Sequence, residues 1–134
     1  MSPVRVLDSW AILAMFQGAP EAMTVSHLMG LADQGEVELL LSTVNLAEVV
    51  YRLYRKRGAT EAEKAIQALR SRSITIVAVD ESLAYAAGRL KAVHPISIAD
   101  CVAAALAIRE DAPLLTGDHD FERLGDSLVV EYLR

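Results

Sequence analysis

The sequence predicts an α/β fold, a three-layer α/β/α sandwich with a mainly parallel central sheet. Short apolar runs alternate along the chain with segments whose apolar residues follow helical spacing. The connections are short, and strands that alternate with helices in this way form right-handed βαβ units. The chain has 134 residues, so we expect a single domain over residues 1–134.

Five short apolar runs predict the strands. The first is β-branched and ends where Asp8 and Ser9 lead into a helix. The expected strands are Val4–Leu7, Val37–Leu41, Ile74–Val79, Pro113–Leu115 and Leu128–Val130.

Capping residues and apolar spacing predict the helices between these strands. Gly35 and Gly58 close the second and third helices. The expected helices begin at Ser9 or Trp10, before Val25, at Ser42 or Thr43, at Thr60, at Asp80 or Ser82, and at Ser97. The fifth carries the apolar stripe Leu83, Ala86, Ala87, Leu90 and Val93, and the sixth continues to about Arg109.

Composition excludes several classes of protein. A hydrophobic fraction of 53% and a mean hydropathy of +0.29 exclude a disordered chain. The single cysteine, Cys101, excludes an internal disulfide and a CxxC zinc site, and it fits a cytoplasmic protein. The longest apolar run, Val102–Ile108, is far shorter than the ~20 residues that span a bilayer, so no membrane segment is expected.

The net charge of −5 disfavours a generic nucleic-acid binder, whose surface is usually basic. This average misleads where several carboxylates gather to hold cations. Four such carboxylates, discussed next, account for four of the five net negative charges.

Four acids are placed so that they can meet at one end of the sheet. Asp8 follows the first strand, Asp118 follows the fourth, Glu48 lies in the helix after the second, and Asp100 lies in the first turn of the last long helix. Ligands of parallel sheets collect beyond the carboxyl ends of the strands. Converging carboxylates repel one another unless cations or protons neutralise them, and oxygen ligands select Mg²⁺ or Mn²⁺. The pattern suggests a metal-activated water that attacks a phosphodiester.

Each acid also has a simpler interpretation. Asp8 can cap the helix that begins at Ser9 or Trp10. Taken alone, Asp100 is more typical of a capping box with Ser97. Asp118 and Asp120 can be ordinary turn residues.

Glu48 is the hardest to explain without a function, because an unpaired carboxylate that faces a core is unfavourable. Its helix has a polar side, formed by Asn45, Arg52 and Arg55, so exposure of Glu48 stays possible.

With these residues identified, the sequence resembles the PIN-domain family, and within it the VapC-type toxins of bacterial and archaeal toxin–antitoxin pairs. Four segments carry the resemblance in family order over essentially the whole chain: Val6–Ser9, Asn45–Val49, Ser97–Ala107 and Leu115–Phe121. Two departures are mild. Trp10 follows Ser9 where a small or aliphatic residue is more usual, and Cys101 replaces an alanine; packing is the expected role of both.

The resemblance implies an Mg²⁺- or Mn²⁺-dependent endoribonuclease, usually a homodimer, that a cognate antitoxin protein holds inactive. Asp8, Glu48, Asp100 and Asp118 match the acidic quartet, and Asp120 matches an acid present in some members. Ser9 and Thr116 match hydroxyl positions that support the site. Either Glu48 or Asp118 could help deprotonate the attacking water.

A run of basic residues leads away from Glu48 along its helix. These residues, Arg52, Arg55, Lys56 and Arg57, could contact RNA phosphates. A solvated helix end that complements the helix dipole is the simpler explanation of these residues. The three histidines are scattered, and His119 alone lies near the acids.

Three other functions are alternatives to a ribonuclease. A receiver-like phosphoacceptor domain needs paired acids beside the first strand and a lysine near the end of a later strand, and a haloacid-dehalogenase-like phosphatase needs a second Asp where Trp10 stands. The chain has neither pattern. A catalytically silent PIN-fold interaction module stays open, although the complete quartet argues against it.

Overall fold

A computed structural model describes residues 2–133 and contains the predicted parallel sheet. Its five strands run in the order β3-β2-β1-β4-β5, and all four neighbouring pairs are parallel. The strands are β1 (Val4–Leu7), β2 (Glu38–Ser42), β3 (Ile74–Val77), β4 (Leu114–Thr116) and β5 (Val130–Tyr132).

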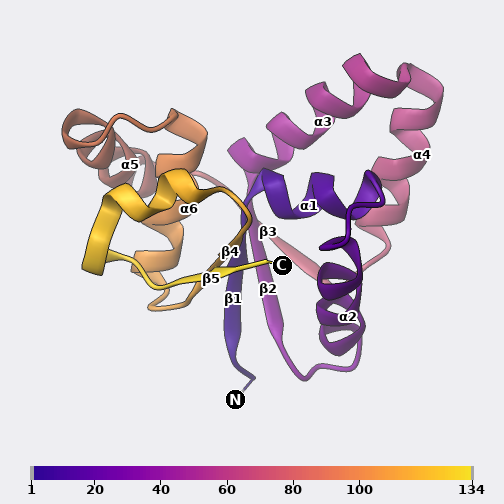
Figure 1. Ribbon diagram of the computed structural model, residues 1–134, viewed down its shortest axis with the longest axis horizontal. Coiled ribbons are helices and arrows are strands. Elements are labelled where there is room, and N and C mark those ends of the chain that lie inside the picture. Colours follow the sequence, from indigo (N-terminus) through magenta and orange to yellow (C-terminus); the bar gives the residue numbers. More distant parts are fainter. Residues whose placement is uncertain (1, 134) are drawn as a thin grey trace.

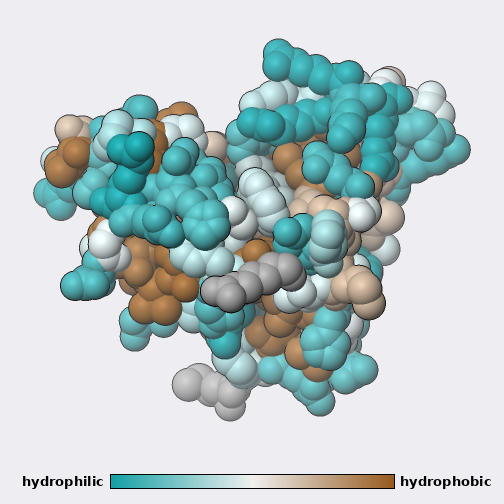
Figure 2. All heavy atoms as spheres, in the orientation of Figure 1, coloured by the Kyte–Doolittle hydropathy of each residue, from teal (hydrophilic) through white to brown (hydrophobic). Residues whose placement is uncertain are grey.

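Helices cover both faces of the sheet, so the expected α/β/α sandwich is confirmed (Figure 1). The helices on one face are α1 (Ser9–Phe16), α2 (Ala22–Asp33), α3 (Thr43–Arg57) and α4 (Ala59–Arg70). Those on the other are α5 (Glu81–Val93), α6 (Ile98–Arg109) and the 3₁₀ segment η1 (His119–Ser127). Figure 2 shows that hydrophilic residues dominate the surface over α3 and α4.

Alternation along the strands divides the core into two layers. Leu7, Leu39 and Leu41 point to the layer formed with α1–α4. Val6 and Leu40 point to the layer formed with α5, α6 and η1. A strand segment buried on both faces is apolar at every position, and residues 6–7 of β1 and 39–41 of β2 are accordingly uninterrupted apolar runs.

The order of the strands creates a crevice at the sheet edge. From β1 the chain moves to β2 and β3, and then returns on the opposite face to form β4 on the other side of β1. At such a switch point the connections leave the carboxyl ends of two adjacent strands in opposite directions. The segments that follow Leu7 and Thr116 therefore border an open space.

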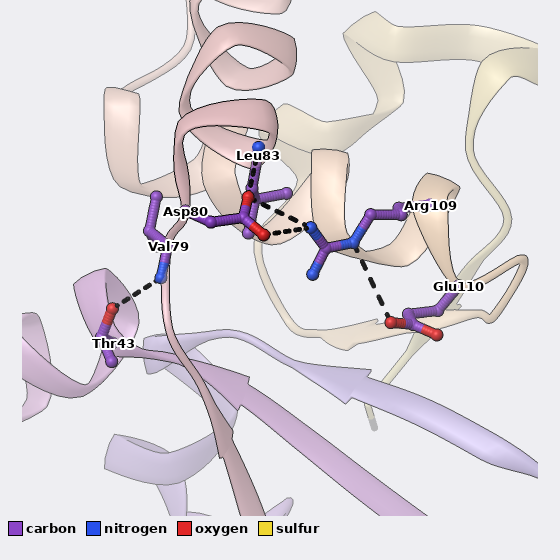
Figure 3. A network of polar contacts seen from close by, with 6 residues as sticks. All are labelled: Thr43, Val79, Asp80, Leu83, Arg109 and Glu110. Atoms are coloured by element: carbon purple, nitrogen blue, oxygen red, sulfur yellow. Dashed lines mark hydrogen bonds and ion pairs between the residues drawn. The ribbon is translucent and has the colours of Figure 1, made fainter.

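Strand boundaries differ slightly from those expected. The strands β2, β4 and β5 begin one or two residues later than predicted. The strand β3 ends at Val77 rather than Val79, because the Val79 backbone N–H donates to Thr43 Oγ1 at 3.2 Å instead of joining the sheet ladder (Figure 3).

Asp80 is the residue that opens α5, one of the two alternatives expected. Its Oδ1 accepts a hydrogen bond from the Leu83 backbone N–H at 2.8 Å. The guanidinium of Arg109 lies 3.4 Å from both oxygens of the same carboxylate, so the start of α5 is tied to the end of α6 (Figure 3).

The prediction that Thr60 caps the fourth helix is wrong. The helix α4 begins at Ala59, and Gly58 serves both as the last cap of α3 and the first of α4. Gly58 has φ 79°, a left-handed conformation that glycine adopts without steric strain. One residue therefore suffices to reverse the chain.

The predicted stripe of α5 is only partly buried. Leu83 and Ala87 are buried, whereas Ala86 is exposed and Val93 is 76% exposed. The reason is that α5 packs mainly against one neighbour, α6, which covers a narrower stripe than a full amphipathic face.

Among residues 2–133, no single helix has both the length and the apolar composition to cross a membrane. The helices α5 and α6 meet these criteria only as a pair bent by 119°.

Candidate functional site

All four predicted acids line one cavity of about 430 Å³. It lies where the carboxyl ends of β1 and β4 border the crevice. Its lining residues are Asp8, Ser9, Trp10, Leu13, Ala14, Gln17, Ala19, Glu48, Arg52, Ser97, Asp100 and Asp118.

Asp8 is almost completely buried, with 1% of its surface exposed. Its Oδ1 caps α1 by accepting from the Ala11 backbone N–H at 3.0 Å, and its Oδ2 accepts from the Thr116 hydroxyl. The capping interpretation is therefore correct, and it is compatible with a place in the cavity. The two bonds fix the carboxylate at the end of β1.

Glu48 enters the cavity from the second turn of α3. Its Oε1 accepts from the Ser9 hydroxyl, and its Oε2 lies 3.4 Å from the Arg52 guanidinium, one turn further along the same helix. The two bonds fix the orientation of the carboxylate. Glu48 is only partly exposed, because 17% of its side chain is accessible to solvent.

Asp118 is held by the loop that follows β4. Its backbone N–H donates to Thr116 Oγ1 at 3.0 Å, and its Oδ1 accepts from the Asp120 backbone N–H at 2.9 Å. Thr116 is buried and joins Asp118 to Asp8. Asp120 is exposed and is not among the lining residues.

Asp100 occupies the first turn of α6, where Ser97 Oγ accepts from the Asp100 backbone N–H at 3.1 Å. A buried amide positions this turn against α3. Asn45 Nδ2 donates to the Ala99 carbonyl at 3.3 Å, and Asn45 Oδ1 accepts from the Ser42 hydroxyl at 2.6 Å.

The placement of Asn45 on an exposed polar side of its helix is wrong, because the residue is 0% exposed. The first turn of α3 packs against α6, and the amide satisfies its hydrogen bonds there. Asn45 therefore ties the first turn of α3, the helix of Glu48, to the first turn of α6, which carries Asp100.

Burial and mutual repulsion make two of the carboxyls weak acids. Burial raises the pKa of Asp8 to about 7, against the lowering effect of the Thr116 and Ala11 hydrogen bonds, and the charges of Asp100 and Asp118 add to the rise. Burial also raises the pKa of Asp100 to about 6, with contributions from Asp118 and Glu48. Binding of a proton or a cation in this cavity is therefore favourable, because it reduces the repulsion between the carboxylates.

The donors fit a hard divalent cation by their chemistry. They are carboxylate and hydroxyl oxygens from four segments of the chain, which suits Mg²⁺ or Mn²⁺ better than zinc. Within residues 2–133, no three acidic, histidine or cysteine side chains stand close enough to form a ready-made cage. The oxygens instead bind Ser9, Thr116, Arg52 and backbone N–H groups.

Cys101 and His119 each follow one of the acids in the sequence. Cys101 is buried, and burial raises the pKa of its thiol, so the structural role expected of it is confirmed. His119 is exposed, and its ring stacks on Tyr132 with centroids 4.5 Å apart.

The sequence does not predict the roles of two residues of the site. For Asn45 it predicts an exposed position, although a polar residue three positions before Glu48 could have indicated that Asn45 supports the site. Trp10 was assigned a packing role; it does pack against the core, but it also forms part of the cavity wall.

A second cavity of about 430 Å³ shares Leu13, Gln17 and Arg52 with the acidic one. The rest of its lining is aromatic, apolar or basic: Tyr51, Leu53, Arg55, Lys56 and Arg57. The guanidinium of Arg55 lies over the Tyr51 ring, 5.0 Å from its centroid. The basic run is thus joined to the acidic cavity through Arg52.

Comparison with known proteins identifies relatives of this architecture. The family model described as PIN domain matches residues 5–127. A search of curated protein sequences finds no significant match.

Solved structures share the fold over nearly the whole chain. The VapBC2 complex of Rickettsia felis, bound to a DNA fragment from its promoter, has a TM-score of 0.78 at 20% identity, covering 98% of this chain and 99% of that chain. Mycobacterium tuberculosis VapC20, described as a Sarcin-Ricin loop cleaving toxin, has a TM-score of 0.72 at 20% identity, with coverages of 90% and 95%. A toxin–antitoxin complex from Klebsiella pneumoniae has a TM-score of 0.70 at 17% identity, with coverages of 93% and 95%.

Proposed function

Because this chain belongs to the PIN-domain family, we propose that it is a divalent-metal-dependent endoribonuclease, the toxin of a toxin–antitoxin pair. The observation that carries the proposal is the meeting of Asp8, Glu48, Asp100 and Asp118 in one cavity at the switch point of the sheet. Four acids from four separate segments have no common structural purpose, since capping explains only some of them.

Asp8, Asp100 and Asp118 would hold Mg²⁺ or Mn²⁺, directly or through water, with Glu48 as a further ligand or as an orienting group. A cation held there would supply an activated water and would stabilise charge on the phosphate. The protein's own residues have separate tasks. Thr116 fixes Asp8 and Asp118 relative to each other, and Ser9 and Arg52 orient the Glu48 carboxylate. Glu48 or Asp118 takes the proton of the attacking water.

The substrate class follows from similarity and from charge. The similar VapC20 is described as a toxin that cleaves the Sarcin-Ricin loop, and this chain is proposed to cleave RNA as well. Basic side chains next to the acidic cavity support this, because they can hold phosphates that flank the cleaved one. Arg55, Lys56 and Arg57 occupy the last turn of α3, so they complement the helix dipole as well.

The proposed partners are a cognate antitoxin protein and a second copy of this chain. The similar structures include a toxin–antitoxin complex, which supports the first. The homodimer rests on the family resemblance. A cytoplasmic location is proposed on the same basis, together with the single buried cysteine.

Mapping of RNA 5′ ends after brief induction in cells tests the proposal. We expect new, discrete ends with the wild-type chain and none with Asp8→Asn. Asp126→Asn, which removes an exposed carboxylate outside the cavity, is the matched control and should give the wild-type map. Identical maps from wild type and Asp8→Asn, with both proteins folded, would contradict RNA cleavage and favour a catalytically silent module.

A further inference from the structure

The acidic cavity has a second, apolar wall that the proposed chemistry does not use. Three residues of α1, namely Trp10, Leu13 and Ala14, form it together with Ala19. Trp10 is only partly buried, and its side chain contacts both the core and the cavity. The indole therefore presents part of its surface to the cavity as well as to the core.

The indole is fixed against the backbone that carries Asp118. A Cβ atom at Gly117 would overlap the six-membered ring of Trp10, so only glycine leaves room for the ring there. Trp10 also lies two residues after Asp8. The ring is therefore held between the segments that supply two of the acids.

Electrostatics indicates what the wall is for. The chain as a whole carries −5, so its net charge does not attract RNA, and a contact that does not depend on charge would add to the affinity supplied by a bound cation and by the basic residues beside the cavity. Base stacking on an aromatic side chain is an attraction that does not depend on charge or on sequence. The size of the cavity, about 430 Å³, lies within the ~300–1,000 Å³ range of small-ligand sites.

We propose that Trp10 stacks on a nucleobase of the RNA next to the cleaved phosphate, and that the substrate is unpaired at this nucleotide. The inference rests on the proposed ribonuclease function. A base inside a duplex has both faces covered by its neighbours, so only a single-stranded or looped segment can offer one to the indole. Trp10 is thus a substrate-binding residue that selects unpaired RNA.

The chain offers a direct probe, because Trp10 is its only tryptophan. Selective excitation of indole in the Asp8→Asn protein, which does not cleave, reports on this one ring. Short single-stranded homopolymers of adenylate and uridylate should quench its emission in a saturable way, whereas an RNA duplex of the same length should not. Emission that stays unchanged with every RNA would overturn the proposal and would indicate that the apolar wall contacts a protein partner instead.

Substitutions separate stacking from packing. In the Asp8→Asn background, Trp10→Leu should weaken binding of labelled single-stranded RNA about 5- to 150-fold, and Trp10→Phe much less. Tyr85→Ala, which removes an exposed aromatic on α5 outside the cavity, is the control and should not change the affinity. Equal affinities for the Leu and Phe variants, both verified as folded, would mean that the wall is only apolar.

The two proposals fail in distinguishable ways. If the wild-type chain cleaves RNA but Trp10→Leu keeps the wild-type KM, kcat and affinity, the stacking role is wrong and the nuclease stands. If RNA quenches Trp10 but the wild type and Asp8→Asn are equally inert, the nuclease is wrong and the chain is an RNA-binding module.

Discussion

The Thr116 hydroxyl donates to Asp8 Oδ2 and accepts from the Asp118 backbone N–H at 3.0 Å, so one buried side chain at the end of β4 positions two acids. The residues meet because β1 and β4 are paired in parallel with Leu7 opposite Leu115, which brings the next residues of both strands to the same edge. The acid pair is therefore positioned by a residue of the sheet, although Asp118 itself lies in the loop after β4.

Replacement of Thr116 by valine tests this relationship. It keeps the shape of the side chain but removes the donor to Asp8 and the acceptor for Asp118, so the free energy of unfolding should fall by about 1–3 kcal/mol. Because the Thr116 hydrogen bond lowers the pKa of Asp8, its loss should also move the pH–rate profile of RNA cleavage toward alkaline pH. Thr116→Ser keeps the hydroxyl and should retain the wild-type stability and pH–rate profile. Equal stabilities and profiles for the serine and valine variants would show that the hydroxyl does not position the acids.

Asp8 should make the metal-free protein less stable as the pH rises. Its pKa is raised from 3.8 in the unfolded chain to about 7 in the fold. Between these values the folded state binds more protons than the unfolded state, so the free energy of unfolding falls as the pH increases from about 4 to about 7. Asp8→Asn removes this effect.

Urea unfolding in the presence of a chelator measures the difference between wild type and Asp8→Asn. It should be near zero at about pH 4 and reach roughly 2–4 kcal/mol in favour of the variant above about pH 7. Added Mg²⁺ should stabilise the wild type more than the variant at the higher pH. A difference that does not vary with pH would contradict the pKa assignment, and Asp126→Asn should show none.

The contact between Trp10 and Gly117 predicts a strong coupling between two positions far apart in the sequence. Gly117→Ala should lower the free energy of unfolding by about 1–3 kcal/mol, because the new Cβ must displace the indole. In a Trp10→Ala background the space is open, so the same change should be nearly neutral. A double-mutant cycle by urea unfolding gives the coupling free energy. If Gly117→Ala lowers the free energy of unfolding equally in both backgrounds, the Trp10 ring does not pack against Gly117.

The basic run of α3 should act on RNA through charge. Arg55→Gln and Lys56→Gln should each weaken RNA binding at low salt and reduce the slope of log K against log salt by about 0.7. Arg89→Gln, a basic residue of α5 that lies over Tyr85, is the control. Unchanged slopes for Arg55→Gln and Lys56→Gln would return these residues to the role of a solvated helix end.

The sequence predicts those parts of the site that depend on strand ends. Asp8 directly follows an apolar run, and Asp118 follows another after Thr116 and Gly117. Because the carboxyl ends of neighbouring parallel strands lie at the same edge of a sheet, the pattern predicts that the two acids are close together. Glu48 and Asp100 follow from capped helices that start at the same edge.

Contacts between remote segments set the limit of sequence reasoning. Asn45 looks polar and exposed on its own helix, and only the approach of Ala99 from α6 buries it. The wall formed by Trp10 depends on the missing side chain of Gly117. The end of β3 depends on the Thr43 hydroxyl. In each case the deciding partner is distant in sequence and carries no local pattern.

The most direct test of the central claim is RNA cleavage by the purified chain as a function of Mg²⁺ or Mn²⁺. We predict metal-dependent cleavage of single-stranded RNA that a chelator abolishes. Asp8→Asn, Glu48→Gln, Asp100→Asn and Asp118→Asn should each reduce kcat/KM at least about 100-fold, as expected for loss of a group that positions the ion or the water, while Asp126→Asn should retain full activity. Cleavage that persists in the chelator, or that survives loss of Asp8, Asp100 and Asp118 one at a time, would contradict the claim that these acids form one metal-dependent active site.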